Sequence, residues 1–437
     1  MMPIDQKRRH LLQAILGAPV IASEGLPASL AVAAPVASSE PMQDTSQPRQ
    51  SLPPWQPGLL DIHHIATGRG NATLMVLPDG TTLLMDAGDT ADGPETSFEP
   101  RPNASRRAGE WIGRYLQRRL RDTGGTALDY LFVTHFHPDH TGDPTPRSPR
   151  SGIGDYALSG VTDVAEIVPI TTVVDRGYPS YDYPTVWKAP FAANYFSYIK
   201  SRVDKKQDVQ RFQVGTERQF VGKGYHAASQ PFSVRNLVAS GEVWTGRGED
   251  TIHMFPPLAS LERKDYPNEN LCSAGIRVDY GNFRYFSCAD LTSYTYDGDQ
   301  PWRDVLTAAA RAAGRVDVAT ADHHCMFDGL SADTVRLLRP QAWMIHTWHI
   351  SHPEQVQLER LFSERLYPGP RDVFATTVMK ENLVMNHRLL SRLKSTDGHI
   401  VVRVAADSSF HIFVTDDRDE RDTIKMVSGP YQASRKA

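Results

Sequence analysis

The stretch Thr134-His135-Phe136-His137-Pro138-Asp139-His140-Thr141 places three histidines and one carboxylate within six residues. It follows directly on Leu128-Asp129-Tyr130-Leu131-Phe132-Val133, a short apolar run rich in β-forming residues, which predicts a buried strand. The proline and the glycine that come next predict that the strand ends here. His135 and His137 are two residues apart, so they leave an extended chain on the same side and can bind one ion.

Asp139 and His140 come after the chain has turned, where they can reach a second ion. Imidazole and carboxylate groups suit Zn²⁺ and its borderline neighbours, and two ions about 3.5–4 Å apart form a hydrolytic site. The alternative interpretation is a polar surface loop, but three histidines on this spacing after a buried strand are hard to obtain by chance. The stretch therefore predicts a two-metal site at the end of a strand.

The pattern His-x-His-x-Asp-His resembles the signature of the metallo-β-lactamase superfamily. The resemblance covers residues 59 to about 390 and is most specific in residues 134–141, which we call the metal loop. It implies an α/β fold of four layers, the αββα sandwich, and two divalent metal ions. Zn²⁺ is the expected metal, with Mn²⁺ or iron as alternatives, and Asp139 is expected both to bind a metal and to take part in catalysis.

Two apolar strands before the metal loop, residues 73–77 and 82–85, flank a turn at Pro78-Asp79-Gly80 and predict a hairpin. Gly68-Arg69-Gly70-Asn71 precedes this hairpin, and Asp86-Ala87-Gly88 ends it. The order resembles the opening of the metallo-β-lactamase-like domain of bacterial DNA-uptake (competence) channel proteins. The resemblance implies that Asp86 supports the metal loop and does not itself catalyse.

A second hairpin, with its turn at Gly281-Asn282, ends at Asp290, and the resemblance implies that Asp290 bridges the two metals. A later strand is followed by His323-His324-Cys325, where the resembling proteins have a histidine pair with one metal ligand. We expect His323 to bind metal and His324 to lie near the substrate with a catalytic role. The reverse order fits the same pattern, and Cys325 could be a soft ligand or line the site.

The superfamily usually supplies a third histidine to the first metal, in a segment before the bridging aspartate. No Gly-His pair occurs between Gly142 and Asp290, and His226 and His253 are candidates without a supporting motif. The first metal is therefore expected to have only two histidines and Asp290 from the protein. This departure favours the DNA-uptake-like branch over true β-lactamases.

Residues 144–266 separate the metal loop from the second hairpin and are expected to form an insertion or lid segment. Tyr178 and Tyr181 belong to an aromatic, proline-containing cluster near its start. Two interpretations fit equally: a lid that shapes a substrate pocket, or the core of an inserted subdomain. His352, in a His-Pro pair after a later strand, is expected to border the same pocket.

The beginning of the chain resembles a twin-arginine export signal: Lys7-Arg8-Arg9, a modestly apolar segment, and small residues ending at Ala31-Val32-Ala33. The apolar segment is too short and too interrupted to span a membrane. We expect residues 1–33 to be this signal and residues 34–57, rich in Pro, Ser and Gln, to be a disordered linker. The expected location is periplasmic or secreted, and the alternative is a basic disordered tail.

The metallo-β-lactamase-like domain is expected at residues 58–395. Two partly alternating runs, 399–405 and 409–414, predict a terminal hairpin added to the sheet. Residues 396–437 are therefore expected to be a C-terminal β-hairpin followed by a charged, disordered tail.

The chain has 437 residues, a formal net charge of −4 and three cysteines, too few for a disulfide framework. The acidic net charge argues against tight polynucleotide binding. The resemblance to the metallo-β-lactamase superfamily, together with the resemblance of residues 1–33 to an export signal, implies an exported hydrolase. In such an enzyme two metal ions activate water to attack a small phosphodiester or ester. The alternatives are a lactonase or β-lactamase-like amide hydrolase, and an exported metal-binding protein without turnover.

Overall fold

The computed structural model of the protein describes residues 50–434. The expected export signal and the first part of the expected linker lie outside the described residues. In residues 50–57 the chain packs against the domain: Leu52 and Trp55 are buried, and the Leu52 amide donates to the Asp422 carbonyl at 2.9 Å. The expectation of an unfolded linker does not hold for residues 50–57, because their apolar side chains cover the domain.

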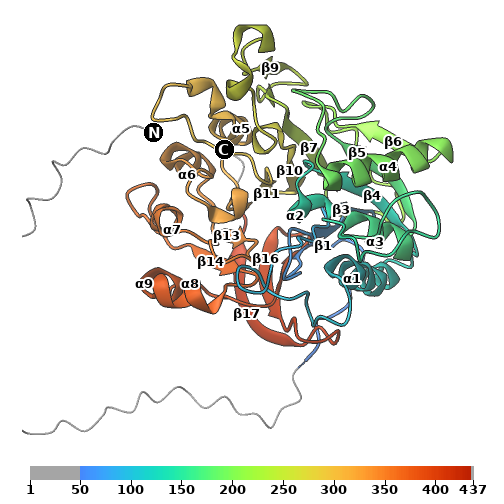
Figure 1. Cartoon of the computed structure of the whole chain (residues 1–437). Helices are drawn as coiled ribbons and strands as arrows, with labels where there is room; N and C mark the ends of the chain where they lie inside the picture. The colour runs from blue at the N-terminus through green and yellow to red at the C-terminus, as the bar shows by residue number, and fades with distance from the viewer. Residues whose placement is uncertain (1–49, 435–437) are drawn as a thin grey trace, which may run out of the picture. The chain divides into compact units, whose positions relative to one another are not determined.

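The first of two large sheets has nine strands and unites the beginning and the end of the described chain (Figure 1). Its N-terminal hairpin pairs antiparallel, whereas the strand that leads into the metal loop pairs parallel with both of its neighbours. In order across the sheet the strands are β17 (Ile424–Gln432), β16 (Ser409–Thr415), β15 (His399–Val404), β1 (Leu60–His64), β2 (Thr73–Val76), β3 (Thr82–Met85), β4 (Leu128–Val133), β5 (Ile170–Asp175) and β6 (Asp208–Arg211).

The second sheet has eight strands, and its parallel half carries the other predicted site residues. Asp290 follows one parallel strand, and the histidine pair follows the next one, so both groups lie at the carboxyl ends of neighbouring strands. In order the strands are β14 (Asp372–Ala375), β13 (Ala342–Ile345), β12 (Val318–Thr320), β11 (Phe283–Ser287), β10 (Gly275–Tyr280), β7 (Phe232–Ala239), β8 (Glu242–Trp244) and β9 (Thr251–His253).

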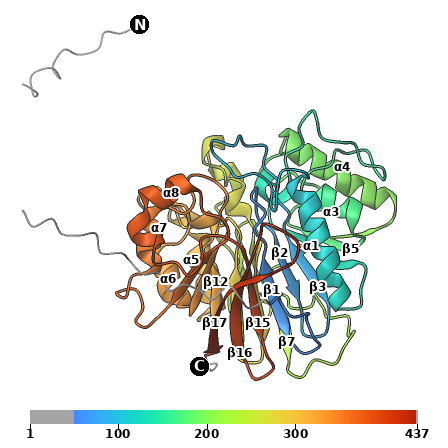
Figure 2. The same ribbon diagram turned by 90° about the horizontal axis from the view of Figure 1, so that it is seen from below.

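Helices cover the outer face of each sheet, as Figure 2 shows from the edge of the sheets. α1, α3 and α4 share a core with the first sheet, and α5, α6, α7 and α9 share one with the second. A third core lies between the two sheets. The helices are α1 (Ala108–Asp122), α2 (Pro138–Thr141), α3 (Val161–Ile167), α4 (Pro190–Asp204), α5 (Val305–Ala313), α6 (Ala332–Leu338), α7 (Gln355–Leu361), α8 (Lys380–Met385) and α9 (His387–Leu390).

Side-chain alternation along β4 explains why this strand is apolar except for Asp129. Leu131 and Val133 enter the core under the helices, whereas Tyr130 and Phe132 enter the core between the sheets. Successive side chains of a strand point to opposite faces, so a strand with both faces covered reads as a continuous apolar run. The four-layer αββα arrangement expected from the sequence is confirmed.

The expected insertion differs from what the structure shows. Residues 144–266 contribute β5 and β6 to the first sheet and β7, β8 and β9 to the second. β7 pairs with β10 over six residue pairs, so this segment forms part of the sandwich. Periodicity along the chain predicts such strands but does not reveal the sheet that each one joins.

The C-terminal hairpin pairs as predicted, β15 with β16, and β15 extends the first sheet next to β1. The chain then continues as β17, where a charged tail was expected, and pairs with β16. Charged residues between these strands are held by α1: Arg114 and Arg118 pair with Glu420 at 2.6 Å. Among residues 50–434, no helix combines the length and the apolarity that crossing a membrane requires.

Candidate metal centre

The metal loop begins where β4 ends, and α2 turns the chain within it. Pro138 occupies the first turn of α2, a position that needs no backbone N–H donor. His135 and His137 precede the turn, and His135 Nε2 lies 3.2 Å from His137 Nδ1. The short helix then presents Asp139 and His140 to the other sheet.

Two groups of side chains meet at the end of β4, and Asp290 belongs to both. His135, His137 and Asp290 can hold one ion, and Asp139, His140, Asp290 and His324 can hold another. In the first group His135 Nε2 is 3.8 Å from Asp290 Oδ2. The structure thus places Asp290 where a bridging ligand is expected.

The second group is the more compact of the two. His324 Nε2 lies 3.0 Å from Asp139 Oδ2 and 3.0 Å from Asp290 Oδ2. His140 Nε2 lies 3.2 Å from Asp290 Oδ1 and 3.5 Å from Asp139 Oδ2. Two imidazole nitrogens therefore converge on the same pair of carboxylates.

The histidine pair takes the reverse of the expected order: His324 enters the cluster, and His323 does not. Both residues adopt positive φ, 51° and 53°, in a tight turn at His323–Cys325. His323 Nδ1 lies 2.6 Å from Asp328 Oδ1, and its Nε2 lies 3.0 Å from Asn270 Nδ2. These contacts hold His323 beside the cluster while its neighbour turns inward. Cys325 is buried and belongs to neither group of metal-binding side chains among the described residues.

Asp86 lies under the metal loop, and its carboxylate contacts two residues of that loop. Its Oδ1 accepts the Thr134 amide at 2.8 Å, and its Oδ2 accepts the Thr134 hydroxyl at 2.8 Å. Asp86 Oδ2 also lies 2.7 Å from His140 Nδ1. A carboxylate at Nδ1 fixes the ring and keeps the proton there, so that Nε2 keeps its lone pair for a metal.

The two glycine-containing motifs of the first hairpin explain how the loop keeps its course. The Asn71 amide donates to the Asp139 carbonyl at 2.8 Å, and the Gly88 amide donates to the Asn71 carbonyl at 2.9 Å. A Cβ at Gly88 would lie 1.8 Å from the Asp139 carbonyl oxygen. Only glycine allows this close approach, so the motif positions Asp139 through the backbone.

Burial and charge act in opposite directions on the ionisable groups. Burial lowers the pKa of His140, but Asp290, Asp139 and Asp86 more than offset that effect and hold its pKa well above the usual value. Burial raises the pKa of Asp290, but His324 and His140 reverse the shift and hold it well below the usual value. Protonated imidazoles or metal cations can both balance these carboxylates, and metal binding would release the protons.

His135 differs from its neighbour His140. Its pKa lies well below the usual value, because burial and the nearby His140 charge both disfavour its protonated form. His135 is therefore a neutral imidazole, the form that binds metals. Its Nδ1 lies 3.1 Å from the Thr134 hydroxyl, which leaves Nε2 for an ion.

The donor set fits divalent metal ions. His140 Nε2 and Asp290 Oδ1 are buried and make no hydrogen bond within residues 50–434, although they face each other. Buried polar atoms without partners are uncommon and call for an explanation. Imidazole nitrogens with carboxylate oxygens form the ligand chemistry that Zn²⁺ and similar ions take.

The predicted pocket residues have different surroundings. The Tyr181 hydroxyl donates to Asp175 Oδ2 at 2.7 Å, and Tyr181 and Tyr178 pack against the core under the helices of the first sheet. Their placement favours core packing over a lid. His352 is buried and stacks on His324 with ring centres 4.8 Å apart, so it borders the second group.

Trp187 borders the first group, and the sequence did not distinguish it within its aromatic cluster. Its ring centre lies 5.7 Å from that of His137 in an edge-on contact. Its buried indole N–H makes no hydrogen bond to any described residue. The spacing of aromatic residues carries no signal that selects Trp187, since the contact joins distant segments.

No third histidine joins the first group within the described residues. His226 lies against Trp55, with ring centres 5.8 Å apart, and His253 is exposed on the edge strand β9.

Below the metal loop, Glu269 accepts the Phe136 amide at 2.8 Å and pairs with Arg176. The buried Glu269–Arg176 pair therefore supports the backbone between the two histidines.

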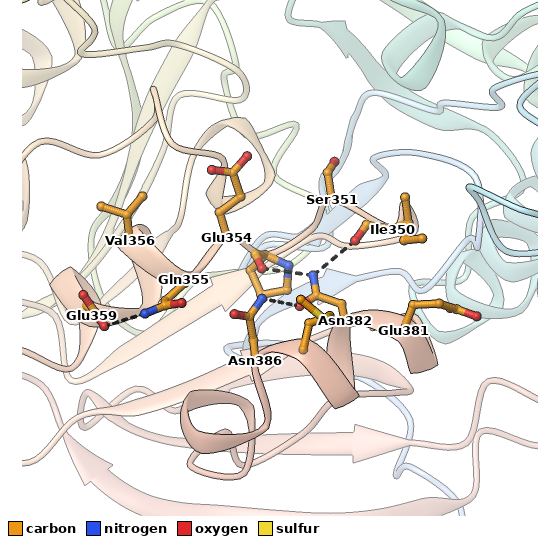
Figure 3. Close-up of a pocket in the computed structure, with 11 residues that line it drawn as sticks. Ile350, Ser351, Glu354, Gln355, Val356, Glu359, Glu381, Asn382 and Asn386 are labelled. Atoms are coloured by element: carbon orange, nitrogen blue, oxygen red, sulfur yellow. Dashed lines mark hydrogen bonds between the residues drawn. The ribbon is translucent and has the colours of Figure 1, made fainter. Parts of the chain in front are cut away.

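A cavity of about 570 Å³ lies beside α7 and α8, apart from these groups (Figure 3). Asn382 crosses it and donates to the Pro353 carbonyl at 3.0 Å. Glu354, Glu359 and Glu381 give its lining an acidic character. The predicted metal-binding residues are absent from its lining, so the candidate centre remains the His/Asp cluster.

Residues 65–143 match the family model described as the metallo-beta-lactamase superfamily. The matched segment contains Asp86 and the whole metal loop, whereas Asp290 and His324 lie beyond it. No curated protein matches the chain significantly. The matched segment and the two large sheets together identify a metallo-β-lactamase-type fold.

Solved structures resemble the chain distantly. A protein from Parabacteroides distasonis, provisionally described as a metal-dependent hydrolase, is 11% identical with a TM-score of 0.33; the alignment covers 73% of this chain and 94% of that one. The metallo-β-lactamase fold protein YhfI from Bacillus subtilis is 10% identical with a TM-score of 0.34, over 79% and 99% of the two chains. The assignment of the fold rests on the sheets and on the matched segment.

Proposed function

We propose that the protein is a metal-dependent hydrolase that holds two divalent ions and cleaves a small phosphodiester or ester. Zn²⁺ is the metal that we expect. One observation carries the proposal: two groups of metal-binding side chains share the carboxylate of Asp290. A pair of sites bridged in this way is the arrangement used for metal-assisted hydrolysis. Each site also has a neighbouring side chain that fixes a ligand, Thr134 for His135 and Asp86 for His140.

Bound ions would lower the pKa of a water molecule and polarise the substrate oxygen. The chain's own residues hold this centre and border it. Asp139 is the more exposed of the two clustered carboxylates, at 17% for its side chain against 3% for Asp290. We assign it the catalytic role of accepting the proton of the attacking water.

His324 takes the place of a ligand in this proposal, and His352 and Trp187 border the substrate. The indole N–H of Trp187 is buried and makes no hydrogen bond to any described residue, so a substrate oxygen that reached it would meet a donor without a partner. His352 is held neutral, because burial and the His324 charge keep its pKa well below the usual value. As a neutral imidazole it can take part in a hydrogen bond beside the second group.

We rank phosphodiesters first among the candidate substrates because the first group contains only two histidines, where the superfamily usually supplies three. This departure favours the DNA-uptake-like branch over true β-lactamases. The acidic net charge of −4 supports a small substrate over a polynucleotide. Lactones and β-lactams are the alternative substrates of the same centre. The signal-like residues 1–33 support export, which cell fractionation with and without these residues would test.

The test compares two neighbouring histidines. Purified protein would be analysed for metal and assayed on bis-p-nitrophenyl phosphate, a p-nitrophenyl ester, a lactone and nitrocefin, before and after chelation. We expect two metal equivalents and chelator-sensitive hydrolysis, which His324→Ala loses together with at least one equivalent. His323→Ala is the matched control and should keep both equivalents.

Full activity in His324→Ala, or protein that cannot be loaded with metal, would overturn the proposal. Two bound equivalents without hydrolysis of any substrate would instead identify a metal-binding protein. Hydrolysis of the lactone or nitrocefin in preference to the phosphodiester would keep the metal centre and change the substrate.

A further inference from the structure

Three aromatic side chains form an exposed group, which we call the aromatic patch: Tyr294, Tyr296 and Phe327. Their exposed fractions are 36%, 47% and 49%. The ring centre of Tyr294 lies 5.0 Å from that of Tyr296 and 5.7 Å from that of Phe327. Exposed apolar side chains that cluster in this way mark binding surfaces more often than those that are scattered singly.

The patch lies on the two loops that carry metal-binding residues of the second sheet. Tyr294 and Tyr296 follow Asp290 after β11, and Phe327 follows His324 after β12. The loops are joined, because the Ser293 amide donates to the Asp328 carbonyl at 2.9 Å. The patch therefore lies on two joined loops, each of which also carries a residue of the metal centre.

A buried cation supports the patch from below. The Arg303 guanidinium lies 4.8 Å from the centre of the Tyr296 ring, and Arg303 is buried. It is also fixed by a hydrogen bond to the Gln300 side chain at 3.0 Å. One face of Tyr296 is thus held in place while 47% of the residue stays open to a ligand.

The charges around the patch select the kind of ligand. Asp297 and Asp299 neighbour Tyr296 in the sequence, Asp328 neighbours Phe327, and residues 291–300 and 326–331 contain no lysine or arginine. The cation beneath Tyr296, Arg303, is buried. A phosphate chain or another anion would meet carboxylates here. An uncharged planar group would stack on the rings without that repulsion.

We propose that the aromatic patch binds a neutral aromatic or planar apolar part of the substrate while the metal centre binds its ester or phosphodiester group. This inference rests on the proposed function and narrows it. The substrate class is then an aryl-substituted ester or phosphodiester, and the patch determines specificity without touching the reacting bond.

The experiment uses two substrates with the same leaving group, p-nitrophenyl phenylphosphonate and p-nitrophenyl methylphosphonate. The wild-type protein should prefer the phenyl compound, chiefly through a lower KM. Tyr294→Ala and Phe327→Ala should each reduce the phenyl-to-methyl ratio of kcat/KM about tenfold, as loss of one stacking ring does elsewhere. Tyr294→Phe should keep the ratio, because the ring remains.

Met385→Ala is the matched control, since Met385 is an apolar side chain of α8 that is 81% exposed. It should leave the ratio unchanged. An unchanged ratio in Tyr294→Ala and Phe327→Ala would overturn the inference while hydrolysis of the methyl compound still supports the proposed function. A change in sedimentation caused by the patch variants would assign the patch to a second copy of the chain and would also overturn it.

If the protein hydrolyses neither phosphonate, the patch is tested by binding alone, independently of the test of the proposed function. Saturation-transfer NMR with phenylphosphonate on the metal-loaded protein should show contact with the phenyl protons. The double variant Tyr294→Ala, Phe327→Ala should abolish this saturation-transfer signal. Equal signals from wild type and the double variant would refute the proposed binding role of the aromatic patch, independently of the proposed function.

Discussion

Asp86 Oδ2 lies 2.7 Å from His140 Nδ1, and this contact joins the end of the first hairpin to the metal loop. The same carboxylate accepts both the amide and the hydroxyl of Thr134 at 2.8 Å. One buried side chain therefore sets the direction of the loop and the orientation of a predicted ligand. The contact explains why an Asp-x-Gly sequence precedes the His-rich stretch.

Replacing Asp86 should weaken metal binding without removing a ligand. In Asp86→Asn the amide cannot accept from Thr134 and His140 as the carboxylate does, so His140 loses its fixed tautomer. We expect a loss of about 10–100-fold in metal affinity, the usual effect of such a change. Isothermal titration with Zn²⁺ measures it. Asp129→Asn, which alters a buried aspartate bonded to the Thr82 amide, controls for general destabilisation and should keep the affinity.

A methyl group at Gly88 should displace the metal loop. The added Cβ would lie 1.8 Å from the Asp139 carbonyl oxygen, which is backbone and cannot rotate away. We expect Gly88→Ala to lower the melting temperature and to abolish stoichiometric binding at the second metal site. Gly93→Ala is the control, because no atom lies within 4 Å of its added Cβ. Equal metal content in both variants would contradict the close packing.

Neutralising Glu269 should destabilise the backbone of the metal loop. Glu269 accepts from Arg176 at 3.0 Å and from the Phe136 amide at 2.8 Å, and both charged side chains are buried. Removing one charge of such a pair leaves the other uncompensated and costs about 3–5 kcal/mol. Urea unfolding of Glu269→Gln measures this loss. Arg176→Met in the same chain should recover part of it, whereas an additive loss would argue against the pairing.

Acid should destabilise the protein through buried histidines, and His399 allows a clean measurement. Burial lowers its pKa from 6.5 to about 4, and its Nδ1 accepts the Ala66 amide at 3.0 Å. The unfolded chain therefore takes up the proton first. The contribution of His399 to stability is complete above pH 6.5 and is lost as the pH falls toward 4, at about 1.4 kcal/mol per pH unit.

The measurement is the free energy of unfolding in urea between pH 7.5 and 5. His399→Asn keeps an acceptor near the Nδ1 position and should flatten the pH dependence relative to wild type. His253→Asn, at an exposed position on β9, should reproduce the wild-type slope. A His399→Asn slope as steep as that of wild type would show that His399 titrates normally in the folded protein.

Local sequence determined the parts of the centre that depend on one strand and its turn. The apolar run of β4 and the spacing of His135 and His137 predict a strand with two imidazoles on one side, because side chains alternate along an extended chain. The same reasoning predicts the two hairpins that end at Asp86 and Asp290. All of these residues lie at the ends of strands, where the structure has them.

Only the tertiary structure decided between His323 and His324. Both follow β12 in a turn with positive φ, and the sequence gives two adjacent imidazoles the same local environment. Contacts of the folded chain decide between them: Asn270 and the nearby Asp328 hold His323, whereas the distant Asp139 and Asp290 contact His324. The long-range pairing of β15 with β1 and the placement of Trp187 against His137 were settled in the same way. Periodicity predicts which side of an element is buried, whereas the partner that buries it depends on the packing of segments far apart in the chain.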